Sequence, residues 1–371
     1  MRELVCFSHL RWAFVFQRPQ HLMTRASRDR RVWFIEEPAP GPNLALDCTV
    51  TPEGVHLCVP RVPDGMAPHE AAQAVYDMVA ALARKEGIEA PVAWTWSPMM
   101  LPLLDAVAPR LLVYDCMDEL SGFRFAPAEM LVRERQLLAR ADLVFTGGWS
   151  LWEARRGAHP AVHLFPSCVD VRHFAAARRA LPEPPELAVL PRPRIVYMGV
   201  VDERMDLALL EQVARARPDW SWILLGPVVK IDPADIPRLP NVHLLGPRDY
   251  AVLPTYLAHV DVGMMPFAHN DATRFISPTK TPEYLAAGLP VVSTPVRDVV
   301  RDYGARGLVH VADGWEEFVA AAEASLPTRW DAERWRQVDL VLVDRSWDAT
   351  WGRMDRLITE AEARLGVQSA K

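Results

Sequence analysis

Cysteine, glycine and lysine are each in short supply in this 371-residue chain, and each shortage excludes something. The five cysteines are scattered without a CxxC pair, so we expect free thiols and neither a disulfide framework nor a zinc site. No glycine precedes Gly41, so the glycine-rich loop that binds a dinucleotide is missing, which argues against an NAD enzyme. Only four of the 41 lysines and arginines are lysines, so arginine is the default cation and each lysine stands out.

The chain also lacks an excess of positive charge and any long apolar run. Its net charge of −6 argues against nucleic-acid binding, which usually needs a strongly basic surface. No stretch approaches the roughly 18 apolar residues of a membrane-spanning helix, and no basic, cleavable leader follows Met1. We therefore expect a cytoplasmic protein that contacts a membrane, if at all, peripherally at its inner face. Arg25–Arg31, with four arginines, would meet anionic lipid or an acidic acceptor, and the alternative is a solvated helix end.

Short apolar runs recur along the first half, and helical patterns such as Ala71–Arg84 and Ala128–Arg140 separate several of them. This alternation is typical of parallel α/β units. The strands expected in this half are Leu4–Phe7, Val32–Ile35, Val92–Trp96, Leu111–Tyr114 and Leu143–Thr146.

An alanine- and proline-rich stretch at 176–194 interrupts the rhythm, and its prolines oppose a helix. We therefore predict two Rossmann-like, doubly wound domains, 1–175 and 195–345, joined by this linker and facing a central cleft. A C-terminal helix at 346–371 is expected to pack back on the first domain. The strands expected in the second half are Ile195–Met198, Trp222–Leu225, Val242–Leu245, Val260–Met265, Pro290–Ser293 and Leu308–Val311.

The densest chemical signal is the segment 270–294, NDATRFISPTKTPEYLAAGLPVVST. A helix is expected to begin at Ser277 or at Thr281, because each is a capping residue followed by proline. Either start places free backbone N–H groups and Lys280 within one turn, which suits a phosphate or diphosphate. Glu283 in the first turn would accept hydrogen bonds from sugar hydroxyls. The alternative is an ordinary capped helix whose glutamate only satisfies the helix dipole.

The segment SPTKTPEYLAAGLPVVST resembles the nucleotide-sugar segment of GT-B glycosyltransferases of the retaining family 4 type. With the first-domain segments included, the resemblance is to a bacterial branch that makes envelope or exported polysaccharides, and it implies the GT-B fold. The other segments that carry it are SHLRWAFVFQRPQHL at 8–22, YDCMDELSGF at 114–123, FPSCVDVRHF at 165–174, YMGVVDERMDLALL at 197–210 and GPRDYAVLPTYLAHVDVGMMPF at 246–267.

The resemblance implies a donor site in the second domain. Lys280 and Arg204 would contact the donor diphosphate, and Glu283 would hold the ribose; these three are the candidate catalytic residues. Arg204 stands where the family usually has a lysine. The further candidate donor-binding residues, some of them in the loop that would cup the base, are Gly199, Arg248, Asp249, Tyr250, Ser277, Pro278, Thr279 and Thr281.

Two positions depart from the family pattern. Phe275 stands where the first glutamate of the paired-glutamate motif would fall, and Asp271 is the nearest carboxylate in sequence without matching its spacing. Val200 replaces the arginine that usually follows the loop glycine. These departures leave the recognition of the donor sugar and part of the phosphate clamp unassigned.

Polar side chains follow two expected strands of the first domain, where the cleft and an acceptor would lie. Clustered carboxylates at such an edge would orient an acceptor or act as a general base. The alternatives are ordinary surface contacts for the cations and helix caps for the carboxylates. The candidate acceptor-side residues are His9, Arg11, Trp12, Gln17, Arg18, Asp115 and Asp118.

These observations favour a glycosyltransferase that moves a sugar from a nucleotide-diphosphate donor, with UDP as the expected nucleotide, to a glycan or lipid-linked acceptor. Retention follows from the resemblance, and no metal or other cofactor and no nucleic-acid partner is expected. A GT-B nucleotide-sugar 2-epimerase and a catalytically silent GT-B binding subunit are the alternatives. The oligomeric state is not indicated.

Overall fold

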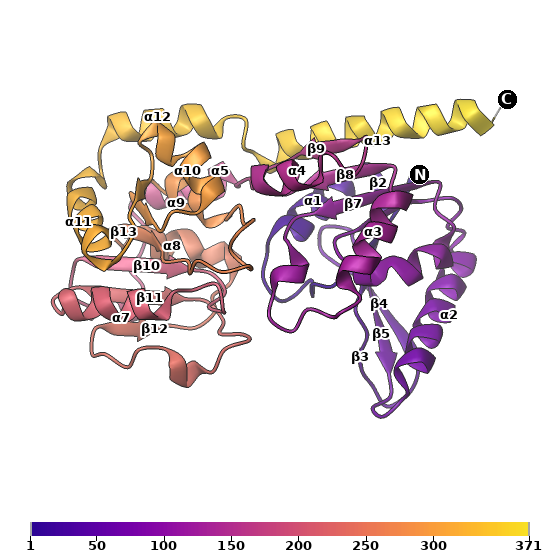
Figure 1. Ribbon diagram of the computed structural model, residues 1–371, viewed down its shortest axis with the longest axis horizontal. Coiled ribbons are helices and arrows are strands. Elements are labelled where there is room, and N and C mark those ends of the chain that lie inside the picture. Colours follow the sequence, from indigo (N-terminus) through magenta and orange to yellow (C-terminus); the bar gives the residue numbers. More distant parts are fainter. Residues whose placement is uncertain (1, 370–371) are drawn as a thin grey trace.

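The computed structural model describes residues 2–369 as two α/β lobes that lie side by side (Figure 1). The strands of the first lobe are β1 (Arg2–Ser8), β2 (Arg30–Glu36), β3 (Ala39–Pro40), β4 (Ala45–Val50), β5 (His56–Val62), β6 (Val92–Thr95), β7 (Leu111–Cys116), β8 (Leu143–Thr146) and β9 (Val162–Leu164). Its helices are α1 (Arg18–Ala26), α2 (Pro68–Glu86), α3 (Met130–Arg140) and α4 (Trp149–Arg155), with 3-10 helices at Pro98–Val107 and Leu120–Gly122. The sheet order is β3-β5-β2-β1-β6-β7-β8-β9, and β4 pairs antiparallel with β5.

The second lobe repeats the pattern. Its strands are β10 (Arg194–Met198), β11 (Ser221–Leu225), β12 (Val242–Leu244), β13 (Val262–Met265), β14 (Val291–Ser293) and β15 (His310–Val311), in the order β12-β11-β10-β13-β14-β15. Its helices are α5 (Val171–Ala175), α6 (Pro185–Ala188), α7 (Leu207–Ala216), α8 (Leu253–Leu257), α9 (Lys280–Ala286), α10 (Arg297–Asp302), α11 (Trp315–Ser325) and α12 (Ala332–Leu342). The last helix, α13 (Trp347–Ser369), follows them.

Helices cover both faces of each sheet, so the central strands are apolar on both sides. Every residue of β6 and of β10 is buried, and β1 is buried from Leu4 onward. The strand pairs are parallel apart from β4 with β5. The predicted α/β class with two parallel sheets is therefore confirmed.

The stretch expected to be a linker, 176–194, packs into the second lobe. Ala177 and Leu187 are fully buried in its core beside Phe174. The chain instead crosses between the lobes just before Val169, because Cys168 belongs to the core of the first lobe and Val169 to that of the second. The richness in proline and alanine therefore marks an irregular segment that packs on the second lobe, and not an exposed linker.

The helix α13 returns from the second lobe and lies along the first, as Figure 1 shows at the top of the view. Its apolar stripe, which includes Trp351, Met354 and Ile358, is buried in the core of the first lobe. Residues 370–371 of the predicted helix lie outside the described residues. The two lobes are thus tied at the crossing before Val169 and again by α13.

Three of the four arginines in the 25–31 run pair with α13, while Arg31 pairs with Glu3 at 3.0 Å. Arg25 pairs with Asp348 at 2.9 Å, and Arg30, which is 2% exposed, pairs with Asp355 at 2.8 Å. These cations hold the last helix in place, which leaves little of the run to meet anionic lipid. Within residues 2–369, no helix is both long and apolar enough to cross a membrane.

Candidate active site

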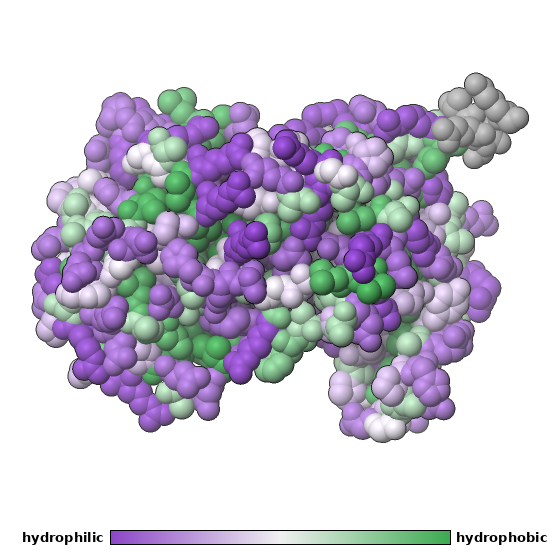
Figure 2. Space-filling model, in the orientation of Figure 1, coloured by the Kyte–Doolittle hydropathy of each residue, from purple (hydrophilic) through white to green (hydrophobic). Residues whose placement is uncertain are grey.

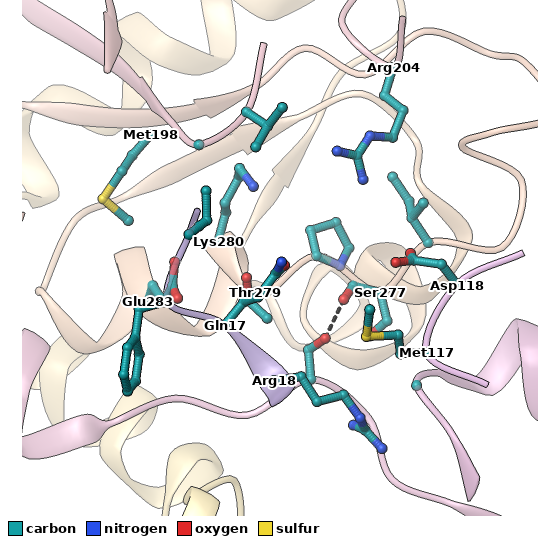
Figure 3. Close-up of a pocket in the computed structure, with 18 of the residues that line it drawn as sticks. Gln17, Arg18, Met117, Asp118, Met198, Arg204, Ser277, Thr279, Lys280 and Glu283 are labelled. Carbon is teal, nitrogen blue, oxygen red and sulfur yellow. Dashed lines mark hydrogen bonds between the residues drawn. The ribbon is translucent and has the colours of Figure 1, made fainter. Parts of the chain in front are cut away.

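A cavity opens between the lobes at the carboxyl ends of the two sheets, where ligands of parallel α/β folds bind (Figure 3). The second lobe lines it with residues 198–200 after β10 and with residues 276–280 at the start of α9. The first lobe contributes residues 15–17 before α1 and Arg18 at its start, together with Met117 and Asp118 after β7.

Gly199 makes room for Lys280. A Cβ atom on Gly199 would lie 2.0 Å from Cε and 2.4 Å from Nζ of Lys280, and the backbone here has a φ of +144°. Gly226, at the end of the neighbouring strand, is equally restricted, since its Cβ would lie 2.0 Å from the carbonyl oxygen of Gly199. Gly199 therefore leaves space for Lys280 at the end of β10, and Gly226 lets the backbone of Gly199 approach the end of β11.

Lys280 and Glu283 lie one turn apart on α9, and both are half-buried. Within residues 2–369, Lys280 Nζ has no hydrogen bond or ion pair, and it lies 5.6 Å from the ring centroid of Tyr197. Burial lowers the pKa of Lys280 and so does Arg204, while Glu283 opposes the change. Burial raises the pKa of Glu283 to about 7, with Lys280 opposing. The ammonium group is therefore partly desolvated and lacks a bound anion.

Arg204 supplies a second cation to the same space. Its guanidinium is held by Asp202, with Nη2–Oδ2 at 2.6 Å and Nε–Oδ1 at 2.9 Å, while 21% of its side chain stays exposed. Figure 3 shows the side chains of Arg204 and Lys280 extending into the same cavity, with Asp118 near Arg204. Burial raises the pKa of Asp118, and Arg204 opposes the change. In the described chain the Asp118 carboxylate makes no side-chain hydrogen bond or ion pair, so it is available to a ligand.

Arg18 and Asp115 are brought together, but they form an ion pair with each other. Arg18 donates from Nε and Nη2 to both oxygens of Asp115 at 2.9 and 2.7 Å, and from Nη1 to the Phe165 carbonyl. Trp96 also donates to Asp115, which is fully buried. The expectation that Asp115 binds an acceptor is therefore not supported, and Figure 3 shows the Arg18 guanidinium turned away from the cavity.

The helix α9 begins at Lys280, between the two starts that the sequence allowed. Ser277, Pro278 and Thr279, which are among the predicted donor-binding residues, line the cavity, and the Ser277 carbonyl accepts a hydrogen bond from Ser167 of the first lobe (dashed in Figure 3). Thr281 is fully buried and its hydroxyl points to Met265 Sδ at 3.3 Å. Its side chain therefore has no route to a donor, contrary to expectation.

A second cavity, of about 380 Å³, adjoins the first on the side of the loop 246–250. Both are lined by Gly199 and Tyr250, so they form one continuous site. Asp249 is exposed at its edge. Trp12, which was expected on the acceptor side, also lines this second cavity.

Arg248 and Tyr250 shape this loop. Arg248 donates to Glu186 at 2.9 Å and to the Tyr256 hydroxyl at 2.5 Å. Its guanidinium therefore holds the loop in place and is already paired with a carboxylate. Tyr250 stacks on His173 with ring centroids 4.3 Å apart. The Tyr250 hydroxyl is buried without a hydrogen-bond partner in the described residues, and a ligand in the cavity would supply one.

Phe275 takes no part in the first cavity. It is half-buried and packs against the core of the first lobe. Asp271 is exposed and lines a separate cavity, so it does not replace the missing glutamate. The position that carries a sugar-binding carboxylate in the resembled pattern is therefore an apolar contact between the lobes.

A third cavity, of about 510 Å³, extends from the first toward the carboxyl ends of β1 and β6. His9, Gln17 and Asp118, which are among the predicted acceptor-side residues, line it. Burial lowers the pKa of His9 to about 4, and its Nδ1 atom is buried without a partner in the described residues. Arg11 instead bonds to Glu36 at 2.9 Å and does not line the cavity.

Two residues of this third cavity were missed by sequence reasoning. The Phe123 ring lies 5.3 Å from the Arg204 guanidinium and 4.5 Å from Lys230 Nζ, so a first-lobe aromatic ring bridges two second-lobe cations. Lys230 is one of only four lysines, which was the one available signal. Nothing in the local pattern marked Phe123.

Within residues 2–369, no group of three or more His, Cys, Asp or Glu side chains is arranged to hold a metal ion. Lys280 and Arg204 both bring positive charge to the first cavity.

The second lobe has a recognisable family relationship. Residues 192–326 match the family model described as Glycosyl transferases group 1, and this segment contains Gly199, Arg204, Lys280 and Glu283. A curated relative, named as the teichuronic acid biosynthesis glycosyltransferase TuaH of Bacillus subtilis (strain 168), is 28% identical over 201 residues. The match covers 49% of this chain and 50% of the relative, so it spans about half the length of that protein.

Solved structures are similar over nearly the whole chain. Sucrose-phosphate synthase from Thermosynechococcus elongatus has a TM-score of 0.71 at 16% identity and covers 98% of this chain and 100% of its own. A trehalose-6-phosphate protein from E. coli, bound with UDP-2-fluoro glucose, has a TM-score of 0.65 at 13% identity, over 97% of this chain and 98% of its own. These likenesses confirm the predicted GT-B fold of two Rossmann-like domains facing a cleft.

Proposed function

We propose that this GT-B protein, whose second lobe matches the group 1 glycosyl transferases, moves a sugar from a nucleotide-diphosphate donor to an acceptor hydroxyl. The observation that carries the proposal is Lys280, a half-buried lysine that reaches the cleft through a gap left by Gly199 and forms no ion pair or hydrogen bond with a described residue. A diphosphate supplies the missing charge.

The donor would lie along the first two cavities. Its diphosphate would sit between Lys280 and Arg204, its ribose hydroxyls would reach Glu283, and its base would enter the cavity beside Tyr250. UDP is the nucleotide we favour, since the structure from E. coli that resembles this chain holds a UDP-sugar. The free Tyr250 hydroxyl provides a further contact.

Catalysis would rest on the leaving diphosphate. As the bond from the sugar to the diphosphate breaks, negative charge grows on the phosphate oxygens, and preorganised cations stabilise that charge more than they stabilise the bound substrate. Arg204 is fixed by Asp202 before any ligand arrives, so its orientation costs little at the moment of reaction. These two side chains would replace a metal ion, and we expect turnover without a metal or other cofactor.

The acceptor would approach from the third cavity, because Asp118 lines both this cavity and the first one, into which Lys280 and Arg204 extend. We favour a glycan or a lipid-linked acceptor and transfer with retention, as the family 4 resemblance of the segment around Lys280 implies. The reaction would take place in the cytoplasm, at the inner face of the membrane when the acceptor is lipid-linked.

The direct test is release of UDP from UDP-sugars by the purified chain, measured with and without EDTA. We expect turnover that persists in EDTA and that Lys280→Ala lowers by at least about tenfold. The anomeric configuration of the product, read by NMR, tests retention. Release of a C2-epimerised sugar would point to an epimerase, and tight UDP binding without any turnover would point to a silent binding subunit.

A further inference from the structure

The third cavity joins the donor cavity at a polar end and becomes apolar farther out. Gln17, Asp118 and Arg204 line both cavities, so an acceptor hydroxyl near Asp118 would meet the donor directly. Beyond them the walls are mainly apolar and come from the segment between β7 and α3, from Met99 and from the loop before α1. The apolar lining includes Phe14, Met99, Leu120, Phe123, Phe125 and Met130.

Phe125 is held out at the open end of this groove. Its side chain is 78% exposed, and its backbone lies in the left-handed region with a φ of +67°, which bulky residues rarely adopt. Such strained positions gather at ligand-binding sites, because the surrounding structure must impose them. The backbone N–H of the preceding residue, Arg124, donates to Glu203 of the second lobe at 3.2 Å, which fixes the segment across the cleft.

Further apolar surface adjoins the groove. Leu131 and Val132, in the first turn of α3, are 54% and 46% exposed, and they follow Met130, which lines the groove. Figure 2 shows a hydrophobic patch over α3, beside the boundary between the lobes. An exposed apolar patch that continues into a cavity marks a binding surface and not random surface apolarity.

The cations at this end are already engaged. Lys230 lies over the Phe123 ring and 3.8 Å from a Glu203 oxygen, and the Arg124 guanidinium lies 5.0 Å from the Phe125 ring centroid. The charged ends of both side chains thus already have partners, an aromatic ring for each and a carboxylate for Lys230. The groove is thus suited to an apolar chain and not to a second anionic group.

We propose that the acceptor is amphipathic: its hydroxyl lies at Asp118, and an attached apolar chain lies along Phe123 and Phe125 toward Met130. This inference rests on the proposed function, and it narrows the acceptor to a hydroxyl compound with an alkyl or prenyl chain close to the reacting group. A soluble amphiphile and a lipid in a membrane share this chemistry.

The test compares n-octyl and methyl β-D-glucopyranoside, titrated calorimetrically into the UDP-saturated protein below the micelle concentration. The two probes share a head group, so their affinity ratio isolates the chain. We expect the octyl compound to bind at least about tenfold tighter, the effect of burying roughly two methylene groups. Phe125→Ser should reduce the ratio to below about threefold. Leu340→Ser, which removes an equally exposed (78%) apolar side chain on α12, should leave it unchanged.

A ratio near one for the wild type, or an unchanged ratio in Phe125→Ser, would overturn the inference. Flotation with dioleoylphosphatidylcholine vesicles separates the two sources: Phe125→Ser that weakens both octyl preference and vesicle binding supports a lipid-borne acceptor, and loss of octyl preference alone supports a soluble one. Loss of vesicle binding with octyl preference intact makes Phe125 a membrane contact and overturns the inference. Failure of the wild type to bind UDP, measured in the same cell, overturns the proposed function instead.

Discussion

At the scale of single residues, the candidate site depends on Gly199 and Lys280, because the lysine side chain fits only where the glycine leaves space. Gly199 has no side chain, and Lys280 occupies the volume that a side chain would take. The lysine is thereby held beside the end of β10, half-buried and without an ion pair or hydrogen bond in the described residues. Position, and not only charge, makes it suited to a diphosphate.

Gly199→Ala should therefore disable the site while leaving the charges in the sequence. The new methyl group would lie 2.0 Å from Lys280 Cε, so the lysine must leave its path. We expect UDP affinity, measured by calorimetry, to fall at least about tenfold, as for loss of one charge-assisted contact. Gly157→Ala, where no atom lies within 4 Å of the added Cβ, serves as control and should bind UDP normally. Unchanged affinity in Gly199→Ala would contradict this account of Lys280.

Glu283 provides a pH-dependent prediction. Burial raises its pKa to about 7, above the ordinary value of 4.5, so the folded state keeps a proton that the unfolded state releases. The stability that this carboxyl contributes is thus present at acidic pH and is lost as the pH rises from about 4.5 to about 7. Relative to wild type, Glu283→Gln should gain on the order of 2–3 kcal/mol of unfolding free energy between pH 4.5 and pH 7.5, measured by urea denaturation. A difference between the two proteins that does not vary with pH would refute it.

At the scale of elements, the lobes are joined by a cap that crosses the cleft. Asp298 on α10 of the second lobe is 2% exposed, and it accepts hydrogen bonds from the backbone N–H (3.1 Å) and the hydroxyl of Ser150 at the start of α4 in the first lobe. Gly148 permits this approach, since a Cβ there would lie 2.3 Å from Asp298 Oδ2. Asp298, which caps α4 from the other lobe, thus holds the lobes together next to Ser277 and the first cavity. We call this contact the α4 cap.

Asp298→Ala should remove both the cap and the tie. We expect the unfolding free energy to fall by about 1–2 kcal/mol and the radius of gyration, measured by small-angle X-ray scattering, to increase. Asp206→Ala is the matched control, because Asp206 caps α7 within one lobe by accepting from the Leu209 N–H at 2.8 Å. That variant should lose similar stability at an unchanged radius. Equal radii for all three proteins would show that the α4 cap does not set the lobe spacing.

At the scale of the whole molecule, the sequence was sufficient where signals are local. Apolar runs predicted the strands, and capping residues with prolines predicted a helix start beside Lys280 and Glu283. The resemblance to GT-B glycosyltransferases added Arg204, and all three residues line one cavity. Pairings distant in sequence were not predictable: Arg18 neutralises Asp115 from 97 positions away. A segment rich in proline such as 176–194 carries no local sign of which core its few apolar residues enter.

The same limit explains the position that departs from the resembled pattern. Phe275 lies on a second-lobe segment, but the core it contacts belongs to the first lobe. Its environment follows from how the lobes meet, which no stretch of sequence near it encodes. Asp118 illustrates the opposite case, because its place after a strand predicted its arrival at the cleft.

The central claim is that the cleft binds a nucleotide diphosphate through Lys280, and a thermal-shift panel of UDP, GDP, ADP and dTDP tests it most directly. A nucleotide at 100 times its dissociation constant should add about 2.7 kcal/mol of apparent stability to the wild type. We predict that UDP does so, that Lys280→Ala largely loses the effect, and that Lys85→Ala, which alters a lysine side chain 80% exposed on α2, keeps it. The claim is contradicted if none of the four nucleotides stabilises the wild type, or if Lys280→Ala responds to UDP as the wild type does.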